Sequence, residues 1–411
     1  MTNLKTALMG TAIGAFIATA AVAECGIDSG SVRILSNDFP ALHAVNEGAM
    51  ACASDSVEVT VNQTADHKDI QVAALTADPA QYTTAVVANS SIVPLINSDL
   101  IRPLDDLVAK YGDGLSQSQL ITIDGKVMAI AFMANAQHLY YRADILEEAG
   151  VAPPTTYEEV VAAGQAIRDA GIMENPFAFN SKAGWNLAEE FVNMYSGMGG
   201  SFFKPGTAEP AINNEAGVKA LEMMKALTEL STPDYLTLDS TATTALWESG
   251  EVALATLWGS QGSAILDHEG STPEIVESTQ LVGAPTVGGG DIPASTLWWD
   301  GFTIAKNISD EDAAATFQAM VNGISPENIA ANNDKAVWLS SAFKPGKSAE
   351  GVVETANGGA NPYPMIPFMG LLHGAIGDNL AEFLQGSESA EQALSDIEAA
   401  YTTAAKEQGF L

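Results

Sequence analysis

The sequence predicts an α/β fold, in two domains or one large bilobed unit, on three observations. Strand-like and helix-like stretches alternate near the N-terminus, which implies a parallel sheet with right-handed crossovers. The chain has 411 residues, more than a single hydrophobic core usually organises. With 47% hydrophobic and 17% charged residues, its composition is that of an ordinary globular protein with ample material for such cores.

Three strands that alternate with two helices begin the predicted sheet. Residues 31–39 (SVRILSNDF) read as a buried strand, and residues 40–53 carry apolar side chains at helical spacing. Residues 56–64 alternate as a second strand, residues 68–77 are helical, and residues 82–91 form a third strand. In such sheets, ligands gather at the carboxyl ends of the strands. The polar residues expected at those ends are Asn37, Asp38, Asn89, Ser90 and Ser91.

The remainder of the chain is richer in predicted helices. A threonine cap and an apolar stripe predict a helix within residues 155–171, and similar patterns fill residues 186–200 and 214–231. Residues 389–410 carry alanine, leucine, isoleucine and tyrosine on one side, as a surface helix does. The Gly- and Pro-rich residues 284–295 form a connection.

The N-terminal residues have the features of a secretory signal peptide. Lys5 precedes an apolar run, and Ala21-Val22-Ala23 is an A-x-A cleavage site, so we expect a signal peptide at 1–23 and a mature chain from Glu24. A membrane anchor is the alternative, but the run is short and no basic stop-transfer residues follow it. An exported, unanchored protein points to the periplasm.

Cys25 and Cys52 are the two cysteines of the chain. Cys25 stands second in the expected mature protein, whereas lipid attachment needs the cysteine first. Two cysteines in an exported chain usually pair, so we predict a disulfide, which would stabilise the fold by about 3–4 kcal/mol. A metal site from two cysteines is the weaker alternative.

The net charge of −34 limits the classes of partner. Nucleic acids and anionic membrane surfaces bind clusters of lysine and arginine, and this chain has 17 basic residues against 51 acidic ones. We therefore expect no nucleic-acid partner. The charge fits a solvated surface that keeps an exported protein soluble, or an acidic face for a basic partner.

Known catalytic motifs are missing from the sequence. The five histidines have no metal-ligand spacing, HExxH and GxSxG are absent, and "VGGG" lacks the pattern of a phosphate loop. We therefore predict that the protein binds no metal ion and no cofactor, and that it is not an enzyme. Because the chain has 51 acidic residues, the sequence leaves open the alternative of a catalytic carboxylate pair like that of glycosidases.

Residues 139–167, LYYRADILEEAGVAPPTTYEEVVAAGQAI, carry the most specific family signal. They resemble the extracellular solute-binding proteins of ABC importers, the group that includes maltose-binding protein. The matching features are a tyrosine-rich strand, a helix ending in Ala-Gly, the Pro153-Pro154 turn and a threonine start to the next helix. "SDLIRPLDDL", "WESGEVALATLWG" and "FLQGSESAEQAL" resemble further segments of that family. Arg142 and Leu254 depart from its pattern, but neither position is expected in the site.

The resemblance implies a two-lobed periplasmic binding protein fold (type II), with the ligand cleft between lobes that crossing strands join. On this basis we expect an N-lobe of residues 24–134 and 297–345, and a C-lobe of residues 135–296 and 346–411. The expected function is capture of a neutral sugar or polyol by a monomer that delivers it, through lobe closure, to ABC transporter permease subunits in the inner membrane.

The candidate ligand contacts combine strand-end polar residues with aromatic residues, because sugars have apolar ring faces and polar edges. The first crossing strand contributes an asparagine, and "SKAGWN" resembles a cleft segment of the family. The full set is Asn37, Asp38, Asn89, Ser90, Asn135, Trp185, Asn186, Trp258, Trp299, Asp300 and His373.

Trp298 and Trp299 are adjacent, so on a strand they point to opposite faces. Phe302 shares the face of Trp298, and we expect that face to be core. The sequence therefore predicts that Trp298 packs and that Trp299 lines the cleft.

An anionic ligand would need a fixed cation in the cleft. Only Lys182 lies in a segment assigned to the cleft, so a neutral ligand is expected. Three other functions stay open: an exported carbohydrate-active enzyme, a binding protein for another small polar solute, and a binding domain that signals rather than transports.

Overall fold

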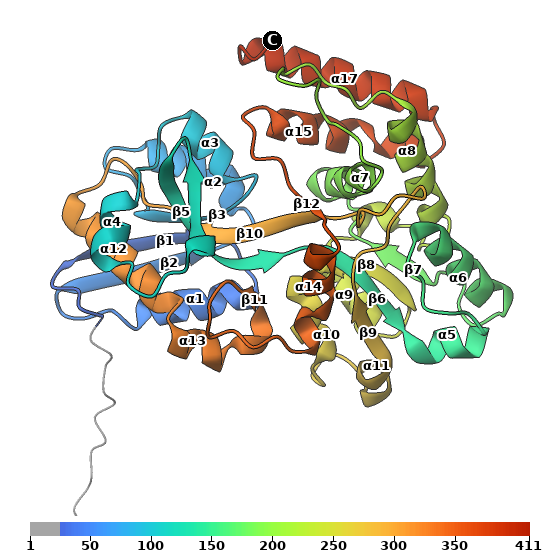
Figure 1. The fold of residues 1–411 in the computed structure, drawn as a ribbon, viewed down its shortest axis with the longest axis horizontal. Helices are drawn as coiled ribbons and strands as arrows, with labels where there is room; N and C mark the ends of the chain where they lie inside the picture. Colours follow the sequence, from blue (N-terminus) through green and yellow to red (C-terminus); the bar gives the residue numbers. More distant parts are fainter. Residues whose placement is uncertain (1–24) are drawn as a thin grey trace, which may run out of the picture.

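The computed structural model describes residues 25–411. The expected signal peptide at residues 1–23 therefore lies outside the described residues. The described chain folds around two separate β-sheets, each with its own helices (Figure 1). We call the lobe around the larger sheet the N-lobe and the other the C-lobe.

The N-lobe sheet has eight strands, with the main order β11-β5-β10-β3-β1-β2. The predicted alternation of strands and helices is confirmed, because β1 runs parallel to both β2 and β3. Later strands enter in the opposite sense, since β10 is antiparallel to β3 and to β5. The strands are β1 (Gly30–Ser36), β2 (Val57–Gln63), β3 (Thr84–Ala88), β4 (Leu120–Ile123), β5 (Lys126–Asn135), β10 (Thr296–Phe302), β11 (Val337–Trp338) and β12 (Asn361–Pro362).

Helices cover both faces of the N-lobe sheet. One face packs apolar side chains such as Ile34 and Phe302 against α1, α12 and α13. The other packs Val87, Ala131 and Trp299 against α2 and α3. The helices are α1 (Pro40–Met50), α2 (His67–Thr76), α3 (Ile92–Asn97), α4 (Asp105–Tyr111), α12 (Asp310–Gly323) and α13 (Pro326–Ala331).

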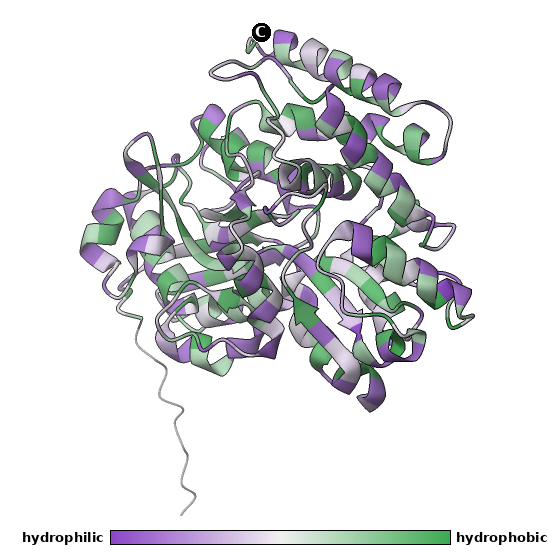
Figure 2. Cartoon of the chain, turned by 45° about the vertical axis from the view of Figure 1, so that its right-hand side comes forward, coloured by the Kyte–Doolittle hydropathy of each residue, from purple (hydrophilic) through white to green (hydrophobic). Residues whose placement is uncertain are grey.

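The C-lobe sheet has four strands in the order β7-β8-β6-β9. They are β6 (Gln137–Arg142), β7 (Phe177–Phe179), β8 (Leu254–Trp258) and β9 (Thr279–Val282). The helices of this lobe are α5 (Ala143–Ala149), α6 (Tyr157–Asp169), α7 (Trp185–Gly197), α8 (Glu215–Thr228), α9 (Ser240–Glu248), α10 (Gly262–Leu266), α11 (Pro273–Ser278), α14 (Glu350–Asn357), α15 (Met369–Asn379), α16 (Ala381–Leu384) and α17 (Ala390–Glu407). Hydrophobic residues run along the strands of both lobes, and hydrophilic residues recur on outer helices such as α17 (Figure 2).

The start of α6 shows how the local sequence fixes an element. The Thr156 hydroxyl accepts a hydrogen bond from the Glu159 amide (3.1 Å), and the Glu159 carboxylate accepts from the Thr156 amide (3.3 Å). This reciprocal cap satisfies amides that the first helical turn leaves free. The preceding helix α5 ends at Gly150, whose φ of 70° suits glycine. The predicted Ala-Gly end and threonine start are thus confirmed.

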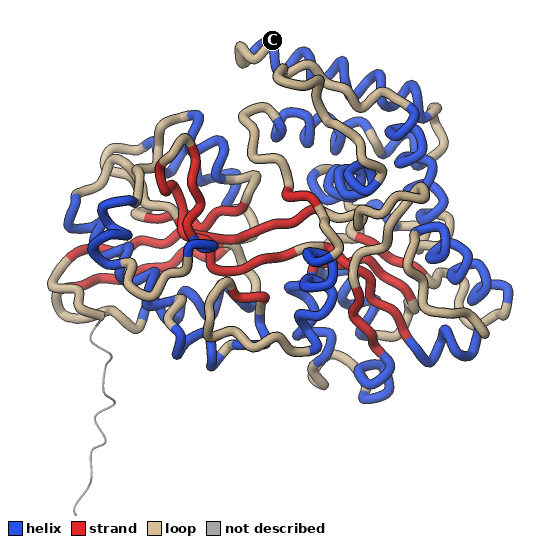
Figure 3. The backbone as a smooth tube through the Cα atoms, in the orientation of Figure 1, coloured by secondary structure: helices blue, strands red, loops and turns tan. Residues whose placement is uncertain are grey.

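Long strands connect the two lobes (Figure 3). β5 belongs to the N-lobe sheet and continues through Ala136 into β6 of the C-lobe sheet. β10 runs beside β5, with Trp298 opposite Asn135 and Trp299 opposite Ala134. These two crossings place the paired tryptophans close to where the lobes meet.

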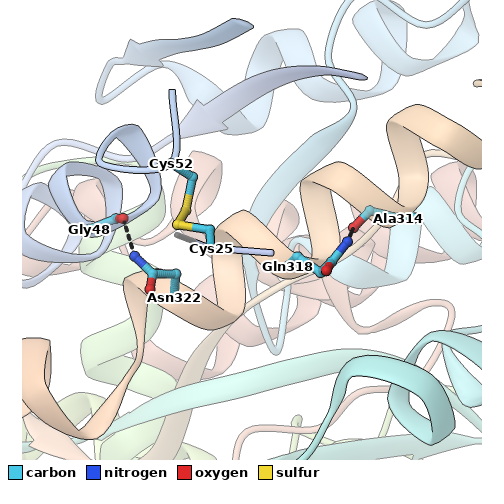
Figure 4. The surroundings of a disulfide bond; sticks show 6 residues. All are labelled: Cys25, Gly48, Cys52, Ala314, Gln318 and Asn322. Carbon is cyan, nitrogen blue, oxygen red and sulfur yellow. Dashed lines mark hydrogen bonds between the residues drawn. A yellow bond between two sulfur atoms is a disulfide. The ribbon is translucent and has the colours of Figure 1, made fainter. Parts of the chain in front are cut away.

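The predicted disulfide is confirmed between Cys25 and Cys52, whose Cα atoms lie 5.5 Å apart (Figure 4). It ties the start of the described chain to the residues that follow α1. Nearby, the Asn322 side-chain amide donates to the Gly48 carbonyl (2.8 Å) and joins α12 to α1.

Candidate functional site

An aromatic cluster lies where the two crossing strands enter the C-lobe. It consists of Trp185, Trp258, Trp298, Tyr363 and His373, and we call these five residues the aromatic cluster. Trp298 lies edge-on to Trp185 (5.6 Å between ring centroids) and to Trp258 (5.8 Å), and it packs on Tyr363 at 4.3 Å. Trp185 and Trp258 are half-buried, whereas Trp298 is only 5% exposed. Trp185 and Trp258 are therefore the tryptophans of the cluster that keep part of their surface accessible to solvent.

His373 holds Trp185 in position. Its ring stacks on the indole at 4.9 Å, and its Nε2 lies 2.9 Å from the Trp185 carbonyl, which accepts a hydrogen bond. Nδ1 lies 3.0 Å from the Tyr363 hydroxyl. Burial lowers the pKa of His373 to about 4, with the backbone contact at Trp185 opposing that shift, so the ring is neutral at physiological pH. With both ring nitrogens occupied, His373 supports the aromatic cluster and has no free group for a ligand.

Glu189 and Trp298 form a buried hydrogen-bond network at the base of the cluster. The Trp298 indole nitrogen donates to Glu189 Oε1 (3.0 Å), and the Thr296 hydroxyl lies 2.6 Å from the same oxygen. Burial raises the pKa of Glu189 to about 8, although these two hydrogen bonds oppose the shift. Glu190, the next residue of α7, is also buried, and its pKa is raised to about 8 for the same main reason. Both side chains are therefore mostly protonated at neutral pH.

Lys68 and Asp300 bring charge to the N-lobe side of the cleft. Lys68 is the second residue of α2, and its ammonium lies 4.2 Å from the ring centroid of Trp185, so it spans the two lobes. Asp300 lies on β10 two residues beyond Trp298, and it is half-buried. Burial raises the pKa of Asp300 to about 7, and the Lys68 charge opposes that shift. The two charges therefore lie within electrostatic reach of each other.

The placement predicted for Trp299 is wrong, whereas Trp298 packs in a core as predicted. Trp298 belongs to the aromatic cluster at the lobe junction, and Trp299 packs in the N-lobe core among residues such as Val87 and Ala131. The two residues do point to opposite faces of β10. However, α2 and α3 cover the face of the N-lobe sheet that carries Trp299, so Trp299 is not free to line a cleft. Trp298 lies nearer the C-lobe and packs into the core of that lobe, against Trp185 and Trp258.

Two predicted ligand residues, Asn89 and Asn135, are instead hydrogen-bonded to other residues of the protein. The Asn89 side chain donates to the Leu297 carbonyl (3.2 Å) and accepts from the Trp299 amide (2.8 Å). The Asn135 side chain accepts from the amide of Ser260 (3.2 Å) and donates to its hydroxyl (3.2 Å). Each side chain thus uses both its nitrogen and its oxygen within the protein: Asn89 ties the end of β3 to β10, and Asn135 ties the end of β5 to Ser260.

The remaining predicted ligand residues differ in how far they are buried and in what they contact. Asn37 accepts from the Asp38 amide (2.8 Å), and Asp38 lies 2.6 Å from His43 on α1, so both residues form a local turn. Asn186 is half-buried beside Trp185. Ser90 lines a pocket of about 350 Å³ between α3 and residues 363–371, two segments from different lobes. Its hydroxyl is buried without a hydrogen-bond partner among the described residues.

Lys68 is the main residue that the sequence argument missed. Ligands gather at strand ends, and Lys68 follows β2 just as the predicted candidates follow β1 and β3. Lys182, the lysine assigned to the cleft, is exposed and pairs with Asp239 (3.0 Å). The statement that the cleft has no other cation is therefore wrong.

Two further features bear on what the site can hold. Within residues 25–411, no three His, Cys, Asp or Glu side chains gather as a metal ion would require. None of the helices in this part of the chain combines the length and apolar character needed to cross a membrane.

Solved structures with the same architecture are bacterial binding proteins. Maltose-bound T. maritima MalE3 has a TM-score of 0.79 at 18% identity, and covers 92% of this chain and 100% of its own. A solute-binding protein from Agrobacterium radiobacter in complex with ribitol has a TM-score of 0.79 at 20% identity, covering 92% and 99%. One from Agrobacterium vitis with bound D-mannitol has a TM-score of 0.76 at 18% identity, covering 93% and 100%. At these identities the likeness shows the two-lobed fold alone.

Sequence comparison identifies the family. A probable ABC transporter-binding protein from Deinococcus radiodurans is 27% identical over 56% of this chain and 57% of its own length. A putative binding protein from Brucella abortus is 24% identical over 45% and 49%. The chain thus spans about half the length of the curated relatives it matches. A family model described as bacterial extracellular solute-binding protein matches residues 55–323, well over half of the sequence. The chain therefore belongs to the family of bacterial extracellular solute-binding proteins.

Proposed function

We propose that this protein captures a sugar or polyol between its lobes and delivers it to an ABC importer. The observation that carries the proposal is the position of the aromatic cluster opposite Lys68 and Asp300. A polyhydroxylated ligand has apolar C–H faces that stack on indole rings, and hydroxyl edges that bond to charged or polar groups. The cleft supplies both kinds of contact from opposite lobes.

The relatives support this class of ligand. Three structures with the same fold were solved with maltose, ribitol and D-mannitol, which are all uncharged and rich in hydroxyl groups. We transfer that chemistry to this chain because half-buried indole rings lie beside the polar side chains of Lys68 and Asp300 at the junction of its lobes.

Each proposed contact has a role. Trp185 and Trp258 stack on the ligand, and Lys68 and Asp300 bind its hydroxyl groups. Asn186 and Ser90 lie further out, where a longer ligand would reach them. His373 and Glu189 position the rings without touching the ligand.

Lobe closure is the proposed mechanism. The moving bodies are residues 24–134 with 297–345, and residues 135–296 with 346–411. The ligand stabilises the closed arrangement because it contacts both bodies at once. Permease subunits in the inner membrane then recognise the closed form of a monomer in the periplasm.

Thermal unfolding and calorimetric titration against a panel of sugars and polyols test the proposal. The panel includes maltose, ribitol and mannitol, and the protein is first unfolded and refolded to remove carried-over ligand. A ligand at 100 times its Kd should add about 2.7 kcal/mol to the free energy of unfolding. If no sugar or polyol raises the melting temperature or releases heat, the proposal is wrong.

A further inference from the structure

The pocket of about 350 Å³ between α3 and residues 363–371 has one side from each lobe. Val72 and Val93 on its N-lobe side pack against the hydrophobic core of that lobe. Ile366 and Leu371 on its C-lobe side pack against the core of the other lobe. The edges of two separate cores therefore face each other across this pocket.

The pocket adjoins the aromatic cluster. Tyr363 belongs to both, since it lines the pocket and packs on Trp298 with 4.3 Å between ring centroids. Helix α2 makes the same connection from the N-lobe. The Lys68 ammonium lies over the Trp185 ring, and Val72, one helical turn further along α2, lines the pocket. A ligand that stacks on Trp185 can therefore extend into the pocket along the junction of the lobes.

The lining of the pocket is mostly apolar and carries no charge. Within the described chain, none of the residues that line it is charged, although the whole sequence has 51 acidic and 17 basic residues. Three of its polar residues, Asn97, Ser98 and Gln408, are exposed to solvent. The fourth is Ser90, whose hydroxyl is buried without a hydrogen-bond partner among the described residues. Inside the pocket, a ligand thus finds apolar surface and one hydroxyl group that can bond to a single oxygen atom.

We infer that this pocket is a subsite for an uncharged apolar substituent, an aryl or short alkyl group, carried by a hydroxylated ligand that stacks on the aromatic cluster. The inference rests on the proposed function and adds a second requirement to it, because a plain sugar or polyol has no such substituent. The oxygen that joins the substituent to the hydroxylated part is the atom that Ser90 would bond.

The size and lining of the pocket favour this substituent over a second sugar ring. An apolar cavity of about 150 Å³ is large enough to bind benzene, so a pocket of about 350 Å³ accommodates a phenyl ring. A second sugar ring would bring several hydroxyl groups, and burial of each one without a partner costs free energy. An aryl or alkyl group has no hydroxyl groups to satisfy.

An occupant of the pocket contacts both lobes. The Asn97 side chain donates a hydrogen bond to the Pro367 carbonyl (3.4 Å), so α3 and the C-lobe segment touch beside the pocket. An apolar group held there removes hydrophobic surface of both lobes from water at once. The substituent therefore stabilises the closed arrangement of the lobes in addition to raising affinity.

Gly370 provides a way to fill the pocket. It lines the pocket as the second residue of α15, and a Cβ added there meets no atom within 4 Å. Gly370→Leu therefore adds apolar volume at the pocket wall without a clash, and leucine suits a helix better than glycine. Gly374 lies one turn further along α15, and a Cβ added there also meets no atom within 4 Å, but Gly374 does not line the pocket. Gly374→Leu is therefore the matched control.

Calorimetric titration with glycosides that share a sugar and differ in the attached group tests the inference. The probes are methyl β-glucoside, phenyl β-glucoside and cellobiose, with methyl β-galactoside, phenyl β-galactoside and lactose as the second set. The unaltered protein and Gly374→Leu should bind a phenyl glycoside at least about tenfold more tightly than the methyl glycoside of the same sugar, because an aromatic ring is buried. The disaccharide should gain less than about threefold over the methyl glycoside.

Gly370→Leu should lower the ratio of phenyl to methyl affinity to about one, while the affinity for the methyl glycoside stays unchanged, because the added side chain takes the place of the phenyl ring. Melting temperatures without ligand establish that both variants are folded.

Four outcomes overturn the inference. If a phenyl glycoside binds no more tightly than its methyl counterpart, the pocket is not an apolar subsite, and the proposed function stands because the sugar itself binds. A disaccharide that gains as much as the phenyl glycoside contradicts the apolar assignment. A ratio that Gly370→Leu leaves unchanged shows that the phenyl group lies elsewhere. If none of the six glycosides binds, this inference fails, and the proposed function fails with it only if the wider panel of sugars and polyols is also silent.

Discussion

The two walls of the cleft differ in chemistry. The C-lobe wall is aromatic, with Trp185 at the start of α7 and Trp258 at the end of β8. The N-lobe wall carries opposite charges, with Lys68 on α2 and Asp300 on β10. A ligand that stabilises the closed arrangement must satisfy both walls, so it needs an apolar face and a hydroxyl edge on the same molecule. Because the two walls differ in chemistry, mutations can measure the contribution of each wall to binding separately.

The largest expected effect concerns the tryptophan that joins the two walls. Replacing Trp298 with alanine should lower the free energy of unfolding by about 3–5 kcal/mol, because a buried indole is lost and Glu189 loses a donor. Trp299→Ala should cost a similar amount, since Trp299 is 9% exposed in the N-lobe core. The two variants should differ in binding: only Trp298→Ala loosens the aromatic cluster. Chemical denaturation and titration of the folded fraction measure both effects, and equal affinities in the two variants would contradict the assignment.

The second effect concerns pH and the acids beneath the aromatic wall. Burial raises the pKa of Glu189 and of Glu190 to about 8, above the ordinary value of 4.5. The folded state therefore binds protons that the unfolded chain has released, and stability falls as pH rises from about 5 to 8. Each group contributes a slope of up to about 1.4 kcal/mol per pH unit in that window.

Glu189→Gln should remove one of these two slopes and raise the melting temperature at pH 8. The amide oxygen can still accept from Trp298, so the aromatic cluster is kept. Denaturation curves at several pH values between 5 and 8 provide the measurement. An unchanged slope would mean that Glu189 is ionised in the folded protein.

The third effect isolates the aromatic wall in binding. Trp185→Ala should weaken sugar or polyol binding by about 1–3 kcal/mol through loss of a stacking surface. Its unliganded stability should fall less than that of Trp298→Ala, because Trp185 is half-buried. Titration calorimetry checks the first statement and thermal unfolding the second. Unchanged affinity would show that the ligand does not contact the aromatic wall at Trp185.

The smallest effect is expected at the end of β1. Asn37→Ala and Asp38→Ala should each change affinity by less than about 0.5 kcal/mol, because both side chains serve a local turn at α1. The same titration measures it. A tenfold loss of affinity in either variant would show that the residues after β1 contact the ligand.

Local pattern was sufficient to predict the α/β class and individual elements, whereas the two-lobed architecture was implied by the family resemblance. Alternating strands and helices, the Ala-Gly end of α5 and the threonine cap of α6 are all short-range signals, and each lies where it was expected. Trp185 and Trp258 were assigned to the cleft from the family resemblance, and the structure brings them together at the lobe junction.

The site was harder to predict, because it depends on long-range placement. Strand parity separated Trp298 from Trp299 correctly, but it did not reveal that both faces of the sheet are covered. Asn89 and Asn135 looked like free strand-end groups, yet each bonds to residues far along the chain. Lys68 escaped notice because its contact with Trp185 joins segments 117 positions apart in different lobes.

Calorimetric titration of one sugar or polyol into Asp300→Asn and into Trp258→Ala tests the central claim most directly. The claim is that a single ligand binds the charged wall and the aromatic wall at once. It predicts that both variants bind the neutral ligand at least about fivefold more weakly than the unaltered protein, with unliganded melting temperatures close to normal. Full affinity in either variant would contradict the claim, because the ligand would then be held by one lobe alone.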